Sequence, residues 1–190
     1  MAREALAVII RFAGQAPFRL RPLSSNVRQL QVAVRSIEVL QHEFTVFEGA
    51  KEDAVVFTNG VLICTAWYGY DPDSKVAFMC HFDHPWSTNS MPAVLAELRR
   101  VSPKNHHYIS KLAGGKSWWW SNCTRRFITQ HVRQADWLSI DIEPASFKNW
   151  PPYEHFAIAT AGGQETSTPL PATRKLEGWS WIVKPMRRVE

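Results

Sequence analysis

The sequence predicts one layered α/β (α+β) domain, and three observations favour this fold class. Strand-like and helix-like segments alternate along the chain, which indicates mixed layers rather than a helix bundle. Short apolar runs follow one another with turn residues between them, as buried strands do. The length, 190 residues at 21.8 kDa, suits a single core, and a composition of 45% hydrophobic and 21% charged residues excludes a chain disordered throughout.

The sequence predicts several strands in the first half of the chain. Segment 30–34 alternates apolar and polar residues, and a β-rich composition continues over 44–49. Three continuous apolar runs follow, at 53–57 (DAVVF), 61–68 (VLICTAWY) and 76–82 (VAFMCHF). Such runs are typical of strands buried on both faces, and the Asp-Pro-Asp-Ser turn between the last two predicts a buried hairpin.

Two helices are expected next, each with capping signals. The first spans 91–100 (MPAVLAELRR), follows a Ser/Thr/Asn-rich cap and ends on two arginines, which interact favourably with a helix C-terminus. The second runs from about 123 to 135 after the capping residue Asn122. Its apolar residues are expected toward the core and its arginines toward solvent: Phe127, Ile128 and Val132 inward, Arg125, Arg126 and Arg133 outward.

The remaining strands complete the predicted domain organisation. Strands are expected at 107–113, before Gly114-Gly115, and at 138–142 (LSIDI). From Pro144 the composition shifts to Pro, Thr, Trp and Gly, with a last strand at 179–183. These signals predict an arm at 1–28, a main domain at 29–143, and an extension at 144–190 packed on the same domain.

The basic charge is concentrated in the N-terminal arm. The chain has a formal charge of +5 and an isoelectric point near 9.3, yet residues 1–36 hold six arginines against one glutamate. The rest of the chain has 16 basic and 16 acidic residues. Because this body is neutral and shows no recognised nucleic-acid motif, we expect no nucleic-acid partner.

Cysteine usage indicates a reducing compartment. Cys64, Cys80 and Cys123 form an odd, irregularly spaced set, which argues against a secreted disulfide framework. We therefore expect a cytoplasmic protein, with a secreted effector as the alternative. The apolar run at 5–10 is too short to span a bilayer, so no membrane insertion is expected.

Cys64 and His81 are the first candidates for chemistry. They fall on the two strands of the predicted hairpin, 17 residues apart, and face each other if the register allows. A neighbouring imidazole favours the thiolate of a cysteine and later protonates the leaving group. The pair therefore predicts a cysteine hydrolase, whereas buried structural cysteine and histidine side chains are the alternative.

The pattern of Thr58, Gly60, Cys64, Asp71-Pro72 and His81 resembles the CheD family of chemoreceptor glutamine deamidases, related in fold to the catalytic domain of cytotoxic necrotizing factor. That family has Thr-x-Gly-x-Gly-Ser-Cys on a strand, an Asp-Pro turn, and a strand ending in small-x-x-His, with the same Cys-to-His spacing. In this chain the threonine lies six residues before the cysteine, and the glycine fills the first glycine position.

The resemblance covers roughly residues 30–143 and departs from the family at two places. The order helix, strand, Gly-Gly, helix, strand is kept, with Gly114-Gly115 at the family's glycine pair. Leu62-Ile63 replaces the family's Gly-Ser, and residues 116–120 (KSWWW) replace its motif after Gly-Gly. The resemblance implies a layered α/β/β/α domain with buried mixed β-sheets and flanking helices.

The resemblance also implies an activity and a set of site residues. It implies conversion of glutamine to glutamate on a protein substrate that presents an exposed glutamine, with glutamate methyl-ester hydrolysis accessible to the same groups. Cys64 is then the nucleophile, His81 the acid and base, and Thr58 the group that orients His81. Expected substrate contacts are Gly60, Gly114, Gly115, Trp118, Trp119 and Trp120. No cofactor and no metal are implied.

Two alternatives use the same residues. Cys80, His81 and His84, with Cys64 or Cys123 as a fourth ligand, have the side-chain types that bind Zn²⁺. Cys80 and His81 are adjacent on a predicted strand, however, so their side chains point to opposite faces. The second alternative is a catalytically silent binding module of the same fold.

Overall fold

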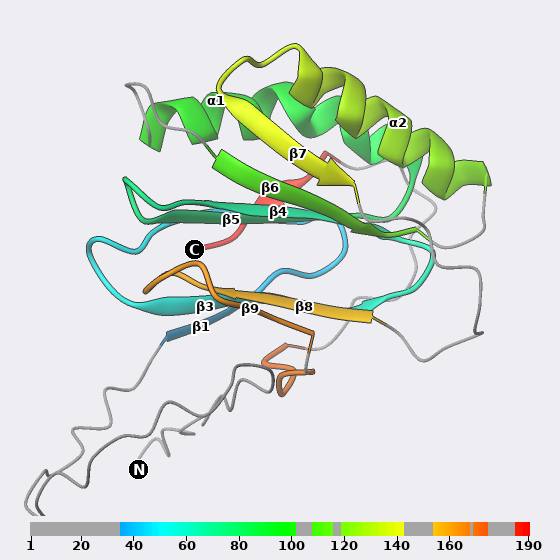
Figure 1. Cartoon of the computed structure of the whole chain (residues 1–190). Helices are drawn as coiled ribbons and strands as arrows, with labels where there is room; N and C mark the ends of the chain where they lie inside the picture. Colours follow the sequence, from blue (N-terminus) through cyan, green and yellow to red (C-terminus); the bar gives the residue numbers. More distant parts are fainter. Residues whose placement is uncertain (1–34, 102–107, 116–118, 143–153, 168, 175–184) are drawn as a thin grey trace, which may run out of the picture.

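Two stacked β-sheets with helices on one side form the part of the chain that the computed structural model describes (Figure 1). The described residues are 35–101, 108–115, 119–142, 154–167, 169–174 and 185–190, and the side chains of 140–142 are not among them. The arm at 1–28 and the strands expected at 30–34 and 179–183 lie outside this set. The mixed helix and strand content confirms the predicted α/β (α+β) class.

The larger sheet has six strands in the order β10-β2-β5-β4-β6-β7. Its four central strands are antiparallel, and a short strand joins each edge in parallel. In chain order the strands are β2 (Glu43–Glu48), β4 (Thr65–Asp71), β5 (Val76–Phe82), β6 (Tyr108–Gly114), β7 (Leu138–Ile142) and β10 (Arg187–Arg188). The predicted hairpin is present as β4 and β5, but β4 begins at Thr65, so the expectation that Cys64 lies on its first strand is wrong. Asp71 closes the turn by accepting hydrogen bonds from the Asp73 and Ser74 amides.

The smaller sheet has four strands in the order β1-β3-β8-β9. They are β1 (Arg35–Glu38), β3 (Ala54–Val61), β8 (Glu154–Ala159) and β9 (Glu165–Thr166). The chain does not turn back at Asn59-Gly60. Instead β3 continues through a bulge between Thr58 and Val61 and crosses to the other sheet as β4. The runs at 53–57 and 61–68 thus lie mainly in different sheets, and Cys64 lies in the connection between them.

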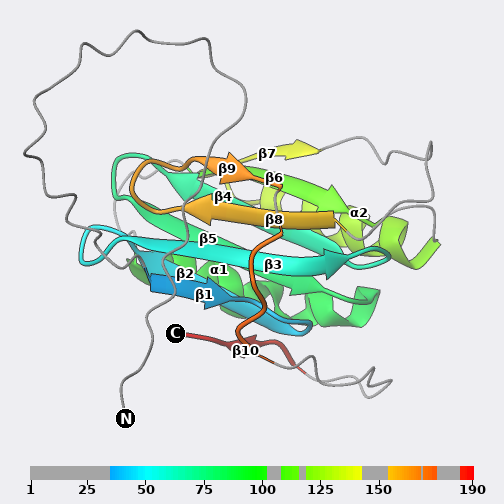
Figure 2. The same ribbon diagram turned by 90° about the horizontal axis from the view of Figure 1, so that it is seen from below.

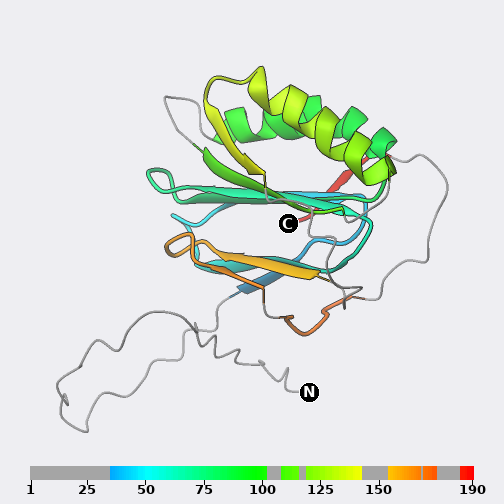
Figure 3. The same cartoon turned by 45° about the vertical axis from the view of Figure 1, so that its right-hand side comes forward.

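Both α-helices cover the outer face of the six-stranded sheet (Figures 1 and 3). The 3₁₀ helix η1 (Pro85–Ser90) leads into α1 (Met91–Val101), and α2 (Trp119–Arg133) follows β6. Seen from below, the four-stranded sheet carries no described helix on its outer face (Figure 2). The described residues therefore form three layers, helix, sheet and sheet, and the second helix layer of the expected α/β/β/α arrangement is absent from them.

Helix α2 differs from its prediction in where it begins and in which of its side chains are buried. It begins at Trp119, four residues before the expected start, so two tryptophans belong to its first turn. Ile128 and Val132 are buried as expected, but Phe127 is 43% exposed. Arg125, expected outside, is buried because its Nη1 donates to the Gly114 carbonyl at 2.6 Å. The Arg125 side chain therefore ties α2 to the end of β6.

Every residue of β5 is buried, and its two faces belong to different cores. Phe78, Cys80 and Phe82 pack with the helices, whereas Ala77 and Met79 pack between the sheets. His81 follows this second face of the strand. The alternation therefore fixes which side of the sheet can hold a site that includes His81.

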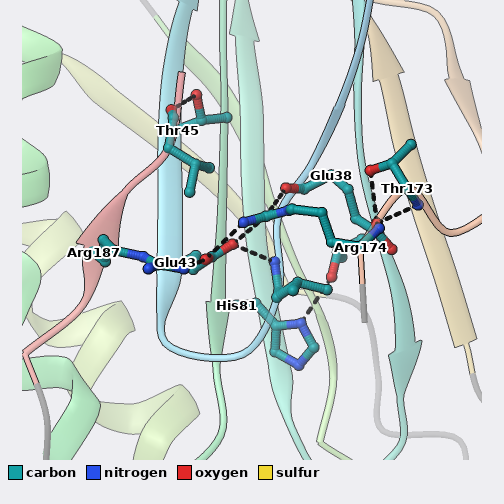
Figure 4. Close-up of polar contacts among 10 residues, drawn as sticks. Glu38, Glu43, Thr45, His81, Thr173, Arg174 and Arg187 are labelled. Atoms are coloured by element: carbon teal, nitrogen blue, oxygen red, sulfur yellow. Dashed lines mark hydrogen bonds and ion pairs between the residues drawn. The ribbon is translucent and has the colours of Figure 1, made fainter. Parts of the chain in front are cut away.

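A buried glutamate joins the C-terminal segment to the sandwich (Figure 4). The carboxylate of Glu43 on β2 is paired with Arg174 and Arg187, and it accepts the Leu40 amide at 2.9 Å. Glu38 accepts hydrogen bonds from Thr173 and from the backbone of Arg174. Together with β8, β9 and β10, these contacts make the described part of the extension integral to the two sheets.

Replacement of Glu43 by glutamine is expected to lower the free energy of unfolding by about 1–3 kcal/mol at pH 7. Burial alone would raise the pKa of Glu43. The hydrogen bonds from Arg174, Arg187 and Leu40 lower it by a larger amount, so the pKa lies below its ordinary value of 4.5. The stabilisation is therefore present above pH 4.5 and is lost as the pH falls toward the lowered pKa.

Urea unfolding of wild type and Glu43→Gln between pH 3 and 7 tests this. Glu48→Gln on the same strand is the control, because its salt bridge with the exposed Lys51 is worth about 0–1 kcal/mol. A wild-type advantage over Glu43→Gln that does not shrink in acid would contradict the role of the charge.

Candidate functional site

The predicted threonine and histidine meet between the two sheets. Thr58 lies on β3 and His81 on β5, and the Thr58 hydroxyl is 2.8 Å from Nδ1 of His81. Both side chains are almost fully buried. This hydrogen bond crosses from one sheet to the other, and it orients the His81 ring in the way that the third member of a catalytic triad orients its base.

Cys64 lies on the same side of the sheet, in the connection from β3 to β4. It packs in the inter-sheet core with Ala66, Ala77 and Met79, and its side chain is 3% exposed. Ala66 pairs with His81 across β4 and β5, so Cys64 stands two residues beyond the position opposite the histidine. No described residue bonds to the buried Nε2 of His81, and the sulfur makes no hydrogen bond to it. The structure thus brings the three predicted residues to one region without a closed Cys–His contact.

Electrostatics keep this pair neutral. Burial, followed by the negative charge of Asp83, raises the pKa of the Cys64 thiol to about 12. Burial lowers the pKa of His81 to about 4, although Asp83 opposes this shift. The expectation that the imidazole favours a thiolate is therefore wrong for this closed site. Both groups are uncharged at neutral pH, because desolvation outweighs every nearby charge.

The glycines expected to contact substrate have backbone roles beside the Cys64 loop. Gly114 and Gly115 are buried and have φ of 76° and 72°, a conformation that favours glycine. A Cβ on Gly114 would lie 2.4 Å from Val61 and 2.9 Å from the Cys64 carbonyl oxygen. Gly60 has φ of 75° in the β3 bulge, with no atom near its missing Cβ. The glycine pair therefore lets β6 approach the loop that carries Cys64.

The first turns of α2 hold the same loop from the other side. The Ser121 hydroxyl donates to the Ile63 carbonyl at 2.5 Å, and Arg125 donates to the Gly114 carbonyl. These contacts fix the backbone on both sides of Cys64. No sequence pattern singled out either residue, because each acts through a backbone carbonyl whose position depends on the tertiary fold.

The aromatic ledge, defined as Trp86, Trp119 and Trp120, borders this part of the molecule. Trp119 is 66% exposed and Trp86 is 52% exposed, whereas Trp120 is partly buried between them. The rings of Trp86 and Trp120 are 6.2 Å apart, and those of Trp119 and Trp120 are 5.3 Å apart. Two of the three expected tryptophans therefore form an exposed surface with Trp86, which the sequence did not indicate, and Trp118 lies outside the described residues.

The zinc set Cys80, His81 and His84 does not assemble. Cys80 is buried in the core on the helix side of β5, whereas His81 faces Thr58 between the sheets. The described residues instead place His42, Asp83 and His84 together, with one ligand-type atom of each within 4.8 Å of the others. Nε2 of His42 is 2.6 Å from the Asp83 carboxylate, and Nε2 of His84 is 3.5 Å from it.

The hydrogen bonds of His84 favour a clamp over a metal site. Its Nδ1 accepts the Ser87 amide at 3.1 Å at the start of η1, so the proton of the neutral ring lies on Nε2, facing Asp83. A metal on Nε2 would require that proton on Nδ1, against the Ser87 N–H. In addition, Nδ1 of His42 has no described partner, whereas metal-bound histidines usually donate from the second nitrogen. We therefore treat the three residues as a clamp, named the His42–Asp83–His84 clamp.

Gln41 is a further residue that the sequence did not reveal. It lies in the turn between β1 and β2, and its Nε2 is 3.8 Å from the Cys64 sulfur. Because Gln41 and Cys64 are 23 residues apart and no motif connects them, only the tertiary structure brings them together.

Thr58→Val is expected to lower the free energy of unfolding by about 1–3 kcal/mol, because it leaves the buried Nδ1 of His81 without its partner. Thr58→Ser should recover most of this loss. Urea denaturation measures both, with Thr124→Val as a matched control, since that buried hydroxyl bonds only within α2. A Thr58→Val protein within about 0.5 kcal/mol of wild type would show that the cross-sheet bond is not formed.

Cys64 is expected to react with iodoacetamide more slowly than the partly buried Cys123 in the folded protein at pH 8. The reason is its burial and its pKa near 12, which leave little thiolate. Peptide mass spectrometry measures both rates, and unfolding in urea should remove the difference. Faster labelling of Cys64 would mean that the resting site holds a thiolate, contrary to the geometry.

The chain matches no family model and no curated protein sequence. The CheD resemblance therefore rests on the spacing of Thr58, Cys64 and His81 and on the order of the elements around them. Neither described α-helix has the length and apolar composition that a membrane span requires.

Proposed function

We propose that this protein is a cysteine-dependent amidohydrolase that converts glutamine side chains of a protein substrate to glutamate, as the CheD resemblance implies. The observation that carries the proposal is the 2.8 Å hydrogen bond between Thr58 and His81. It joins two residues from different sheets in the pairing expected of a base and its orienting group, beside the predicted nucleophile.

The hydrogen bond permits two tautomers of His81, and the proposed base is the tautomer with its proton on Nδ1. When Nδ1–H donates to the Thr58 hydroxyl oxygen, Nε2 carries the free lone pair. That nitrogen is buried and has no described partner, on the face of β5 that Cys64 shares. Nε2 is therefore the atom that takes the thiol proton when substrate binding closes the Cys–His gap.

The reaction follows from these roles. The sulfur of Cys64 forms a bond to the carboxamide carbon of the substrate glutamine, while the thiol proton moves to Nε2 and the carbonyl oxygen takes the negative charge. The carbon–nitrogen bond then breaks, and His81 protonates the departing ammonia. Water next attacks the thioester and gives its proton to His81. The carbon–sulfur bond breaks, Cys64 regains its proton, and glutamate leaves.

The neutral resting pair fixes the order of these steps. Because the thiol pKa is near 12 and the imidazole pKa near 4, no ion pair exists before substrate arrives. The proton must move to His81 as the carbon–sulfur bond forms. A glutamate methyl ester meets the same groups, with methanol as the leaving group in place of ammonia.

The aromatic ledge is the proposed docking surface for the substrate protein. Trp86 of η1 and Trp119 at the start of α2 are exposed, and Ser121 of α2 holds the Cys64 loop. Exposed aromatic side chains are enriched at protein interfaces because they bury large areas with few rotatable bonds. A segment docked on the ledge therefore lies beside the loop that must open to admit a glutamine side chain.

A catalytically silent binding module is the second candidate, and three observations favour it. Cys64 is buried, its pKa is raised, and it makes no hydrogen bond to His81. In such a module the aromatic ledge would bind a partner and the buried polar residues would be structural.

Peptide mass spectrometry separates the two candidates. Casein, an unfolded protein rich in glutamine, is incubated with wild type, with Cys64→Ser, and with Cys123→Ser as the matched control. The hydrolase predicts conversion of glutamine to glutamate, a gain of about one dalton per site with release of ammonia, by wild type and Cys123→Ser only. If wild type converts no more glutamine than Cys64→Ser does, the hydrolase proposal is wrong and the silent binding module is favoured.

A further inference from the structure

The Cys64 sulfur has a side-chain hydrogen-bond donor beside it. Nε2 of Gln41 is 3.8 Å from Sγ. We propose that Gln41 Nε2 supplies the oxyanion-hole donor of this site, which makes Gln41 a catalytic residue. The inference rests on the proposed function, in which Cys64 is the nucleophile.

The geometry fits a donor to the oxygen of a tetrahedral intermediate. A carbonyl carbon bonded to Sγ carries its oxygen two bonds from the sulfur. A donor at 3.8 Å from Sγ can therefore reach the ~2.7–3.1 Å separation that oxyanion-hole donors require. The Gln41 amide N–H then stabilises the developing negative charge.

The orientation of Gln41 supports a donor rather than a self-substrate. The amide nitrogen faces the sulfur, whereas attack would require the carbonyl carbon to face it.

A strained turn holds Gln41 in place. The turn is closed by the Glu43 amide donating to the Leu40 carbonyl at 3.1 Å, and its third residue, His42, has φ of 60°. That conformation is unfavourable for a residue with a Cβ and persists only where surrounding contacts enforce it. The neighbouring Gln41 therefore projects from a backbone that cannot relax freely.

The His42–Asp83–His84 clamp enforces that turn. Nε2 of His42 lies 2.6 Å from Asp83, and the His42 backbone donates to the His81 carbonyl at 3.1 Å and accepts from the Arg187 amide at 2.7 Å. Asp83 in turn follows His81 by two residues, directly after the end of β5. The segment that carries the base thus also sets the position of the oxyanion donor.

Acylation and alkylation of Cys64 separate this role from a structural one. Acylation by p-nitrophenyl acetate passes through an oxyanion, whereas alkylation by iodoacetamide does not, and both reagents need the same access to the sulfur. The two rates at Cys64 are measured by peptide mass spectrometry in wild type and in Gln41→Met, which keeps the size of the side chain and removes the donor. Gln130→Met, at an exposed position of α2, is the control.

We expect the ratio of acylation to alkylation to fall about 100-fold in Gln41→Met and to stay unchanged in Gln130→Met. A ratio in Gln41→Met within about twofold of wild type, or a parallel loss of both rates, would overturn the role of Gln41. Conversion of Gln41 to glutamate in wild type would also overturn it, since the residue would then be a substrate.

The outcomes keep the two proposals apart. If Gln41→Met still converts casein glutamines at the wild-type rate and Cys64→Ser does not, the oxyanion assignment fails and the hydrolase stands. If Cys64 is not acylated in wild type, the assignment of Cys64 as the nucleophile is wrong. The assignment of Gln41 as an oxyanion donor is then wrong as well.

Discussion

The burial of β5 on both faces is the constraint on which the rest of the structure depends. A strand with every side chain buried must divide its residues between two cores, and here Phe78, Cys80 and Phe82 go to the helix side. His81 consequently faces the second sheet, where a polar ring needs a partner, and the Thr58 hydroxyl provides it. The same alternation puts Cys80 on the opposite face of the strand from His81, and Cys64 is the cysteine that packs in the inter-sheet core.

Placement between two sheets gives the site its precision and its low resting reactivity. Neighbouring backbones hold Cys64 and His81 through Ser121, Gly114 and the β4–β5 ladder, but the same packing excludes water. Desolvation then raises the thiol pKa and lowers the imidazole pKa, so both groups rest uncharged. In the proposed hydrolase, opening of the loop by a docked substrate therefore precedes chemistry, and the aromatic ledge lies beside that loop.

Local patterns in the sequence predicted strands β2 to β7 and the β4–β5 hairpin, because period and turn residues are properties of short segments. The pairing of Thr58 with His81 was an implication of the CheD resemblance. Local patterns did not predict β1, β8, β9 or β10, and they failed where tertiary contacts decide. Arg125 reads as a solvent-facing helix residue and is buried only because the Gly114 carbonyl lies within reach. The Gln41–Cys64 contact and the His42–Asp83–His84 clamp bring together residues that are distant in the sequence and share no motif. Trp119 and Trp120 belong to α2, although the capping signal in the sequence lies at Asn122.

The ¹⁵N chemical shifts of the His81 ring test the central claim most directly, because they report which nitrogen carries the proton. At pH 7 the account predicts a neutral ring with its proton on Nδ1, held by Thr58, and a bare Nε2, with the signal of Nδ1–H altered in Thr58→Val. A charged ring, or a proton on Nε2, would contradict it, because neither state leaves His81 a base toward Cys64.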